Sequence, residues 1–155
     1  MTTPATTPPP AQSLCPSWQD IHRLSRALAD RLSTQGPWRA IIAVARGGLV
    51  PTTIIARELG VRMVDTVCIA THGDDGSTHP LRILKVLPGN GEGCLVVDDL
   101  VDTGRTYESV RSYLPKAHYV ALYAKPGGKE QVDTWGVEVN QDVWVHFPWE
   151  RLPES

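Results

Sequence analysis

The residues best suited to chemistry in this sequence lie between positions 95 and 106. An apolar run, Leu95–Val97, leads into adjacent carboxylates at Asp98 and Asp99, and a third carboxylate follows at Asp102. Carboxylate oxygens can accept hydrogen bonds from sugar hydroxyls or ligate magnesium beside a pyrophosphate. They also favour positive charge that develops nearby. The pattern predicts a site for a phosphorylated sugar.

The four residues that follow Asp102 are expected to hold the 5-phosphate of that sugar. Gly104 lets the backbone approach an anion closely, while Thr103, Thr106 and the free N–H groups of a helix start can donate to phosphate oxygens. The alternative is an acidic surface turn that caps a helix. One aspartate often does so, but three packed behind an apolar strand fit that role poorly.

Strands that alternate with helices must position these residues. The apolar pattern predicts strands at 40–45, 64–70, 81–87, 94–97 and 118–124. Helices are expected from Trp18 to Leu32, after a capping box at Ser17–Asp20, from Pro51 to Gly60, and from Thr106 to Tyr113. The alternation predicts an α/β fold with a mainly parallel sheet, whose ligands gather beyond the carboxyl ends of the strands.

The length and composition predict one domain behind a short tail. The chain has 155 residues, of which 41% are hydrophobic, enough for a single substantial core. Residues 1–14 are rich in proline and threonine and have little to bury, so we expect a disordered tail there and a single domain over 15–155.

The overall charge and the cysteines exclude several protein classes. A formal net charge of -2 argues against a nucleic-acid-binding surface and favours a small-molecule partner. The three cysteines are widely spaced without a CxxC pair, which predicts reduced thiols rather than disulfides or a zinc site. The sequence has no apolar run of transmembrane length, so we expect a cytoplasmic protein.

The motif VVDDLVDTGRT, at 96–106, resembles the signature with which type I phosphoribosyltransferases bind phosphoribosyl pyrophosphate (PRPP). The resemblance to bacterial xanthine-guanine members of that family covers about Trp18 to Trp149. It is carried by the segments AVARGGLVPTTIIARELG, VDTVCIA, GEGCLVVDDLVDTG, YAKPGG and QDVWVHFPW. It implies the type I phosphoribosyltransferase fold, in which a small hood and a flexible loop accompany the sheet.

The same resemblance implies a magnesium-dependent enzyme of purine salvage. Such an enzyme transfers the 5-phosphoribosyl group of PRPP to N9 of guanine or xanthine, and more weakly of hypoxanthine. The products are GMP, XMP or IMP and pyrophosphate. It further implies a homotetramer in the cytoplasm, peripherally associated with the inner membrane surface.

The resemblance also assigns residues to PRPP. Asp99 corresponds to a magnesium ligand, and Arg46 with Gly47 corresponds to the loop that grips pyrophosphate, where arginine forms charge-assisted bonds to phosphate. The full PRPP-binding set is Arg46, Gly47, Asp98, Asp99, Leu100, Val101, Asp102, Thr103, Gly104, Arg105 and Thr106.

Four residues are assigned to the purine on the same ground. Asp102 corresponds to a catalytic carboxylate beside N7 of the base, and Lys125 to a lysine that donates to the O6 carbonyl. Considered alone, Lys125 would be a solvent-facing lysine in a turn. Trp144 and Val145 correspond to residues that cover one face of the purine and hold its 2-substituent through backbone groups.

The chain departs from the family in the polar loop at 71–80. The family places there an arginine that reaches PRPP, whereas this sequence has His79 at the nearest position. Arg82 and Lys85 are alternative substitutes, and His79 is also consistent with a solvated loop histidine.

Two other functions stay open at this point. One is a regulator that keeps the fold to sense nucleotides or bind RNA, and the other is a related enzyme for hypoxanthine, adenine or orotate. Lys125 and Trp144 argue against adenine and orotate. The sequence does not rank xanthine, guanine and hypoxanthine, because these bases differ only around the 2-position.

Overall fold

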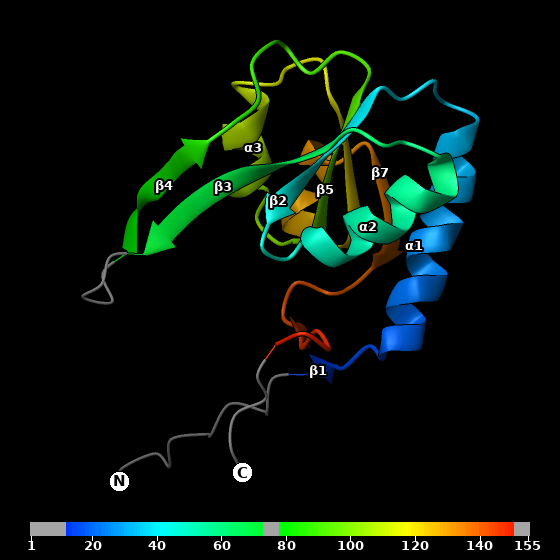
Figure 1. The fold of residues 1–155 in the computed structure, drawn as a ribbon. Coiled ribbons are helices and arrows are strands. Elements are labelled where there is room, and N and C mark those ends of the chain that lie inside the picture. Colours follow the sequence, from blue (N-terminus) through cyan, green and yellow to red (C-terminus); the bar gives the residue numbers. More distant parts are fainter. Residues whose placement is uncertain (1–11, 73–77, 151–155) are drawn as a thin grey trace, which may run out of the picture.

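The main sheet of this protein has six strands, and β5 (Cys94–Val101), which contains the first part of the acidic motif, is one of its inner strands (Figure 1). The computed structural model describes residues 12–72 and 78–150, and its main sheet has the order β4-β3-β2-β5-β6-β7. The strands are β2 (Ala40–Ala45), β3 (Val64–His72), β4 (Thr78–Lys85), β5 (Cys94–Val101), β6 (His118–Ala124) and β7 (Thr134–Glu138). All neighbours pair in parallel except β3 and β4, which are antiparallel. The predicted α/β class with a mainly parallel sheet is confirmed.

The helices cover both faces of this sheet. The helical segments are α1 (Trp18–Ser33), α2 (Leu49–Leu59), α3 (Arg105–Arg111) and the 3-10 helix η1 (Pro126–Gln131). Figure 1 shows α1 and α2 together on one face and α3 on the other. The predicted capping box opens α1: Ser17 Oγ accepts from the Asp20 N–H at 3.1 Å, and the Asp20 carboxylate accepts from the Ser17 N–H at 2.8 Å.

The central strands are apolar on both sides because each side faces a separate core. Side chains alternate between the two faces of a strand, so Ile41 and Leu95 pack with α1 and α2 while Ile42 and Val96 pack on the α3 side. Each of these four side chains is fully buried. Burial on both faces is what the unbroken apolar run at 40–45 predicted.

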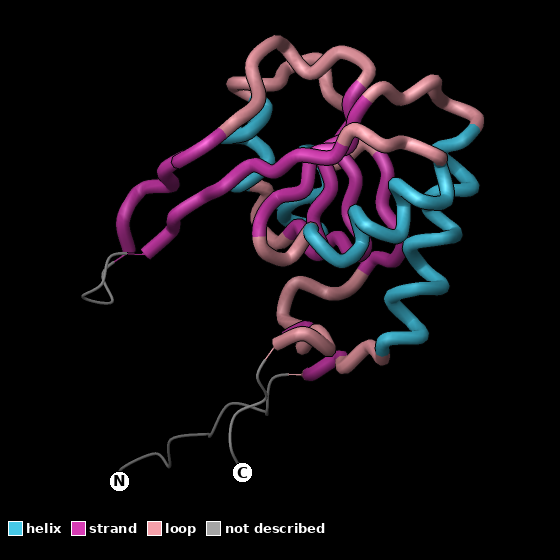
Figure 2. The backbone as a smooth tube through the Cα atoms, in the orientation of Figure 1, coloured by secondary structure: helices cyan, strands magenta, loops and turns pink. Residues whose placement is uncertain are grey.

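Several predicted boundaries shift. The second helix begins at Leu49 rather than Pro51, although it ends at the predicted Gly60 cap. The strand expected to end at Val97 continues to Val101, so the first two carboxylates belong to β5 itself. The returning strand is Thr78–Lys85, and Figure 2 shows that β3 and β4 form an arm that extends beyond the other strands.

A second, two-stranded sheet lies apart from the main one and corresponds to the expected hood (Figure 1). It pairs β1 (Ser13–Leu14) in parallel with β8 (Trp144–Val145). The Trp144 N–H donates to the Gln12 carbonyl at 2.8 Å and the His146 N–H to the Leu14 carbonyl at 2.9 Å. Ser13 and Leu14 are therefore not part of a disordered tail, because their backbone completes this sheet. The rest of the predicted tail, residues 1–11, lies outside the described residues.

The three cysteines differ in how far they are buried. All three cysteines are free thiols: Cys94 is buried, Cys68 is partly buried and Cys15 is exposed. Cys94 is the most enclosed of them, and burial raises the pKa of its thiol. None of the three lies in the motif at 96–106.

His118, at the start of β6, links pH to stability. Its Nε2 lies 2.8 Å from the Thr134 hydroxyl, and its ring centroid lies 5.3 Å from that of Trp38. Burial lowers the pKa of His118 below its ordinary value, an effect that Asp133 opposes and Arg111 reinforces.

We therefore expect the stability contribution of His118 to fall in acid. The unfolded chain regains the ordinary pKa of about 6.5 and binds the proton more readily, so protonation below that pH favours unfolding. Urea unfolding of the wild type and of His118→Gln at about pH 7.5 and about pH 5 would measure this. The wild type should lose stability relative to the variant at the lower pH; a constant difference would contradict the assignment.

Candidate active site

The residues singled out in the sequence meet at the carboxyl ends of three adjacent strands. β2, β5 and β6 are neighbours and run in parallel, so the segments that follow them share one edge of the sheet. Arg46 and Gly47 follow β2, the acidic motif ends β5, and Lys125 follows β6. This edge is where ligands bind in open α/β sheets.

Two neighbouring carboxylates at the end of β5 form the electrostatic centre of the site. Asp98 and Asp99 are both partly exposed by surface area, and the Asp99 N–H donates to Asp98 Oδ1 at 2.8 Å. Burial, followed by the adjacent Asp99 carboxylate, raises the pKa of Asp98 well above its ordinary range. Burial likewise raises the pKa of Asp99, with a smaller contribution from Glu150. A pair of this kind favours a bound cation or proton, since two charged carboxylates repel each other.

The loop after β2 lies directly against Asp99. The peptide between Ala45 and Arg46 is cis, and Arg46 is exposed. A Cβ atom added to Gly47 would lie 2.3 Å from Asp99 Oδ2, well inside contact distance. Only glycine, which has no Cβ atom, lets this loop lie so close to the Asp99 carboxylate.

A small hollow follows the carboxylates. It measures about 100 Å³ and is lined by Asp98, Leu100, Val101, Asp102, Thr103, Gly104, Arg105, Thr106 and Tyr107. Pockets for drug-sized ligands begin near 300 Å³, so this one suits a single phosphate group rather than a whole nucleotide. Tyr107 fixes the floor: it is fully buried, its hydroxyl donates to the Val120 carbonyl, and its ring packs edge-on against Tyr119 at 4.9 Å.

Lys125 is not a solvent-facing turn lysine. It is 5% exposed, and its Nζ lies 3.5 Å from Asp102 Oδ2. The strand register explains the pairing, because Val101 is opposite Ala124 and the next residue of each strand is Asp102 or Lys125. A buried ammonium beside an exposed carboxylate is a polar arrangement suited to a ligand that carries both donors and acceptors.

Trp144 and Val145 lie in the hood. Trp144 is 63% exposed and Val145 is buried. On one edge of β8, the N–H groups of Trp144 and His146 donate to backbone carbonyls of the segment that contains β1. Backbone groups of successive strand residues point to opposite edges, so the N–H and carbonyl of Val145 point away from β1 and can bind a ligand.

The residues present fit a magnesium ion bound together with a phosphorylated ligand. Magnesium usually takes one or two carboxylates from the protein, and phosphates and water supply its other ligands. Asp98 and Asp99 provide that number of carboxylates. Within residues 12–72 and 78–150 no group of three or more His, Cys, Asp or Glu side chains could hold a metal alone. Ligand phosphates would have to complete the coordination.

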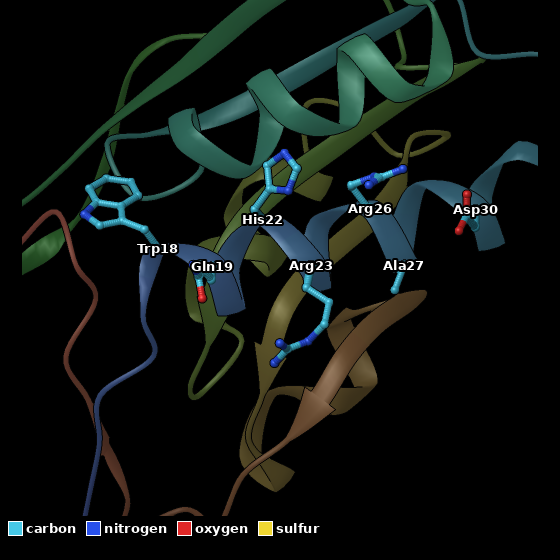
Figure 3. Close-up of a pocket in the computed structure, with 7 residues that line it drawn as sticks. All are labelled: Trp18, Gln19, His22, Arg23, Arg26, Ala27 and Asp30. Carbon is cyan, nitrogen blue, oxygen red and sulfur yellow. The ribbon is translucent and has the colours of Figure 1, made fainter.

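A larger hollow lies along the outer face of α1 and is separate from the motif (Figure 3). It measures about 550 Å³ and its lining comes from α1 alone: Trp18, Gln19, His22, Arg23, Arg26, Ala27 and Asp30. Arg23 pairs with Asp20 at 2.7 Å and Arg26 with Glu58 at 3.1 Å, so its main cations are engaged. We assign no ligand to this surface.

Of the three candidates for the missing loop arginine, the structure accounts for Lys85. Its ammonium contacts the Asp65 carboxylate and lies 3.3 Å from the Thr66 hydroxyl, which ties it across the β3–β4 arm. Arg82 lies exposed on β4. The His79 side chain lies outside the described residues.

One residue of the site had no assigned role in the sequence. Gln141, in the turn between β7 and β8, donates from Nε2 to Asp102 Oδ1 at 2.6 Å. The segment QDVWVHFPW contains it, but only the tryptophan and the valine after it were given roles. Its contact spans 39 positions in the chain, which local spacing does not reveal.

Comparison with known families identifies this arrangement. The family model for the phosphoribosyl transferase domain matches residues 17–152. The chain belongs to the phosphoribosyltransferase family. This phosphoribosyltransferase is 49% identical, over 86% of its length and 82% of the relative's, to the xanthine-guanine phosphoribosyltransferase of Nitratidesulfovibrio vulgaris strain DP4.

Solved structures show the same fold. A purine phosphoribosyltransferase from Pyrococcus horikoshii superimposes on this phosphoribosyltransferase with a TM-score of 0.79 at 26% identity, covering 92% of this chain and 97% of its own. The xanthine-guanine-hypoxanthine phosphoribosyltransferase of Helicobacter pylori gives a TM-score of 0.73 at 21% identity, covering 90% of this chain and 94% of its own. At that identity the second comparison supports the fold alone.

The contact between Gly47 and Asp99 generates a prediction. Gly47→Ala should push the Asp99 carboxylate out of place and weaken Mg²⁺–PRPP binding at least about tenfold, as measured by calorimetry. In the background of Asp99→Ala the same substitution should have little further effect, because the clash has been removed. Equal effects of Gly47→Ala in both backgrounds would show that the contact is unimportant.

Proposed function

We propose that this phosphoribosyltransferase transfers the 5-phosphoribosyl group of PRPP to N9 of a 6-oxopurine, with guanine and xanthine as preferred bases. The observation that carries this proposal is the buried Lys125 ammonium 3.5 Å from Asp102, next to the phosphate-sized hollow. An ammonium can donate to a 6-oxo group but not to a 6-amino group. The 49% identity to a xanthine-guanine phosphoribosyltransferase supports the same choice of bases.

The PRPP half of the site would extend from β2 to α3. The hollow at Asp102–Thr106 suits the 5-phosphate, since Thr103 and Thr106 offer hydroxyl donors. Asp98 and Asp99 would accept from the ribose hydroxyls, and exposed Arg46 is the cation placed for the pyrophosphate. Arg82 is the substitute that we favour for the loop arginine, because Lys85 is engaged with Asp65.

Magnesium, held by Asp99 with Asp98 beside it, would neutralise charge on the leaving pyrophosphate. Its positive charge would also offset the burial that raises the pKa of both carboxyls and the charge of Asp99 that further raises the pKa of Asp98. The chain itself supplies negative charge close to C1′ of the sugar, where positive charge develops as the pyrophosphate leaves. Fixed carboxylates of this kind favour the transition state without having to reorganise.

The purine half would lie between Lys125 and the hood. Lys125 would donate to O6, and the backbone groups of Val145 that point away from β1 would read the 2-position. The exposed indole of Trp144 offers a flat apolar surface on which the ring can stack. Asp102 would accept the proton from N7 as N9 bonds to C1′, which keeps the purine neutral overall.

The alternatives from the sequence are less well supported. Two curated relatives, 49% and 48% identical to this chain, are xanthine-guanine phosphoribosyltransferases, which favours neither an RNA-binding regulator nor an enzyme confined to hypoxanthine. The homotetramer and the peripheral position at the inner membrane stay predictions from the resemblance. No helix in the described part of the chain could span a bilayer.

The proposed function is tested by offering xanthine, guanine, hypoxanthine, adenine and orotate separately, each with Mg²⁺ and PRPP. We expect nucleotide formation to be fastest with guanine and xanthine and to require both Mg²⁺ and PRPP. Turnover of adenine or orotate above the 6-oxopurines would refute the assignment of the base site. Tight PRPP binding without turnover of any base would favour the sensor alternative.

Lys125→Met tests whether the Lys125 ammonium donates a hydrogen bond to O6 of the base. Loss of a charge-assisted hydrogen bond costs about 1.5–3 kcal/mol, so selectivity for guanine over adenine should fall about 10- to 150-fold in kcat/KM. Lys129→Met is the matched control, because Lys129 lies in the same segment but pairs with Glu138 at 2.9 Å. Selectivity that stays unchanged in Lys125→Met, or falls equally in the control, would argue against the role of Lys125.

A further inference from the structure

The side chain of Gln141 joins three parts of the candidate site. It follows β7 in a turn that the Val143 N–H closes onto the Asn140 carbonyl at 3.2 Å, just before the base-covering strand β8. Its Nε2 donates to Asp102 Oδ1 at 2.6 Å, and its Oε1 accepts from the Gly127 N–H at 2.7 Å. One amide therefore connects the loop after β5, the turn after Lys125 and the turn before the hood.

The two partners fix the orientation of this amide. The Gly127 N–H needs an acceptor, and the Asp102 carboxylate needs a donor. Exchanging the oxygen and nitrogen of Gln141 would place the amide oxygen against the Asp102 carboxylate, which is also an acceptor. It would likewise place the NH₂ group against the Gly127 N–H, which is also a donor. Only one orientation satisfies both contacts, and it directs the NH₂ group at Asp102.

The backbone of Gly127 lies close to both the Gln141 side chain and the Asp102 backbone. A Cβ atom added to Gly127 would lie 2.8 Å from Gln141 Oε1 and 3.3 Å from the Asp102 carbonyl oxygen. Gly127 thus leaves the space in which the glutamine side chain lies. The Gln141 Nε2 is also 3.5 Å from the Asp102 carbonyl, so it contacts both the backbone and the carboxylate of that residue.

The two carboxylate oxygens of Asp102 consequently have different surroundings. Oδ1 is hydrogen-bonded to the neutral amide of Gln141, whereas Oδ2 lies 3.5 Å from the Lys125 ammonium. A carboxylate held by one oxygen cannot rotate freely, so the second oxygen keeps a fixed direction towards the lysine. A proton acceptor depends on such orientation for its efficiency.

We propose that Gln141 is a positioning residue for the transfer reaction. It holds the Asp102 carboxylate so that Oδ2 faces N7 of the purine beside Lys125. The inference rests on the proposed function, since it assigns Gln141 to the same chemical step. Gln141 itself touches neither PRPP nor the reacting atoms.

A purely structural role would lead to a different expectation. Gln141 is exposed and packs in neither hydrophobic core, so its loss should leave the melting temperature nearly unchanged. The effect should instead appear in kcat. The affinity for PRPP should also stay the same, because the groups proposed for its pyrophosphate, ribose and 5-phosphate are Arg46, Asp98, Asp99 and Thr103–Thr106, which are not the hydrogen-bond partners of Gln141.

The experiment compares Gln141→Met, which keeps the length but removes both polar atoms, with Gln141→Glu, which turns the donor into an acceptor. Near neutral pH we expect kcat with guanine to fall about 10- to 100-fold in both, short of the about 10²- to 10⁴-fold loss for Asp102→Ala. Calorimetric PRPP affinity should match the wild type. The controls are Gln19→Met and Gln19→Glu, on the exposed start of α1, and they should change neither kcat nor the PRPP affinity.

The pH dependence supplies a readout that a structural role would not change. A protonated glutamic acid can donate to Asp102 as the amide does, so the ratio of kcat in Gln141→Glu to that in Gln141→Met should rise as pH falls from about 8 to about 5.5. The charged groups around the introduced carboxyl are Asp102 from the loop after β5, Lys125 after β6 and the adjacent Asp142. The two variants share these groups, so the ratio isolates the new carboxyl.

The outcomes separate the inference from the proposed function. Wild-type turnover with an unchanged kcat in Gln141→Met, a flat pH ratio, or a loss explained by weaker PRPP binding or lower melting temperature would overturn the inference alone. Absence of turnover in the wild type would overturn the proposed function and the inference with it. Reduced kcat with intact PRPP binding and a rising pH ratio would establish the positioning role.

Discussion

The candidate site depends on one electrostatic constraint: two adjacent carboxylates, Asp98 and Asp99, lie near the end of β5, a central strand of the sheet. Burial raises the pKa values of both carboxyls, and the charge of Asp99 raises the pKa of Asp98 further, so the pair favours a bound cation or proton. The neighbouring loops fit around this pair of carboxylates. Gly47 leaves room for the Asp99 oxygens, Arg46 is exposed in the same loop, and a hollow of about 100 Å³ lies at the end of β5.

The sequence predicted the parts of the molecule whose signals are local. The apolar run of β5, the capping box of α1 and the acidic motif each show in a few consecutive residues. The structure confirms the strand and the capping box, but β5 continues to Val101 and contains the first two carboxylates of the motif. The weaker elements were missed for a physical reason. β1 and β8 are two residues long and exist only because the two ends of the chain pair, and Gln141 acts across 39 positions.

The proposed purine half of the site combines separate segments that no single element could supply. Register between β5 and β6 brings Asp102 beside Lys125, while the hood contributes Trp144 from a different sheet. Gln141 is the side chain that bonds across these segments. Its neutral amide matters, because a charged group there would either compete with Lys125 for the carboxylate or repel it.

The pairing of β1 with β8 has a consequence for how the enzyme is made. It joins backbone segments about 130 residues apart, so closing it orders nearly the entire chain and its entropic cost is met late in folding. During synthesis on the ribosome, the hood that we propose as the cover of the base cannot form until the segment around Trp144 has left the exit tunnel. The hollow proposed for the 5-phosphate is lined by Tyr107, which packs against Tyr119 and bonds to the Val120 carbonyl, so it needs the chain only as far as β6 and can form before the hood.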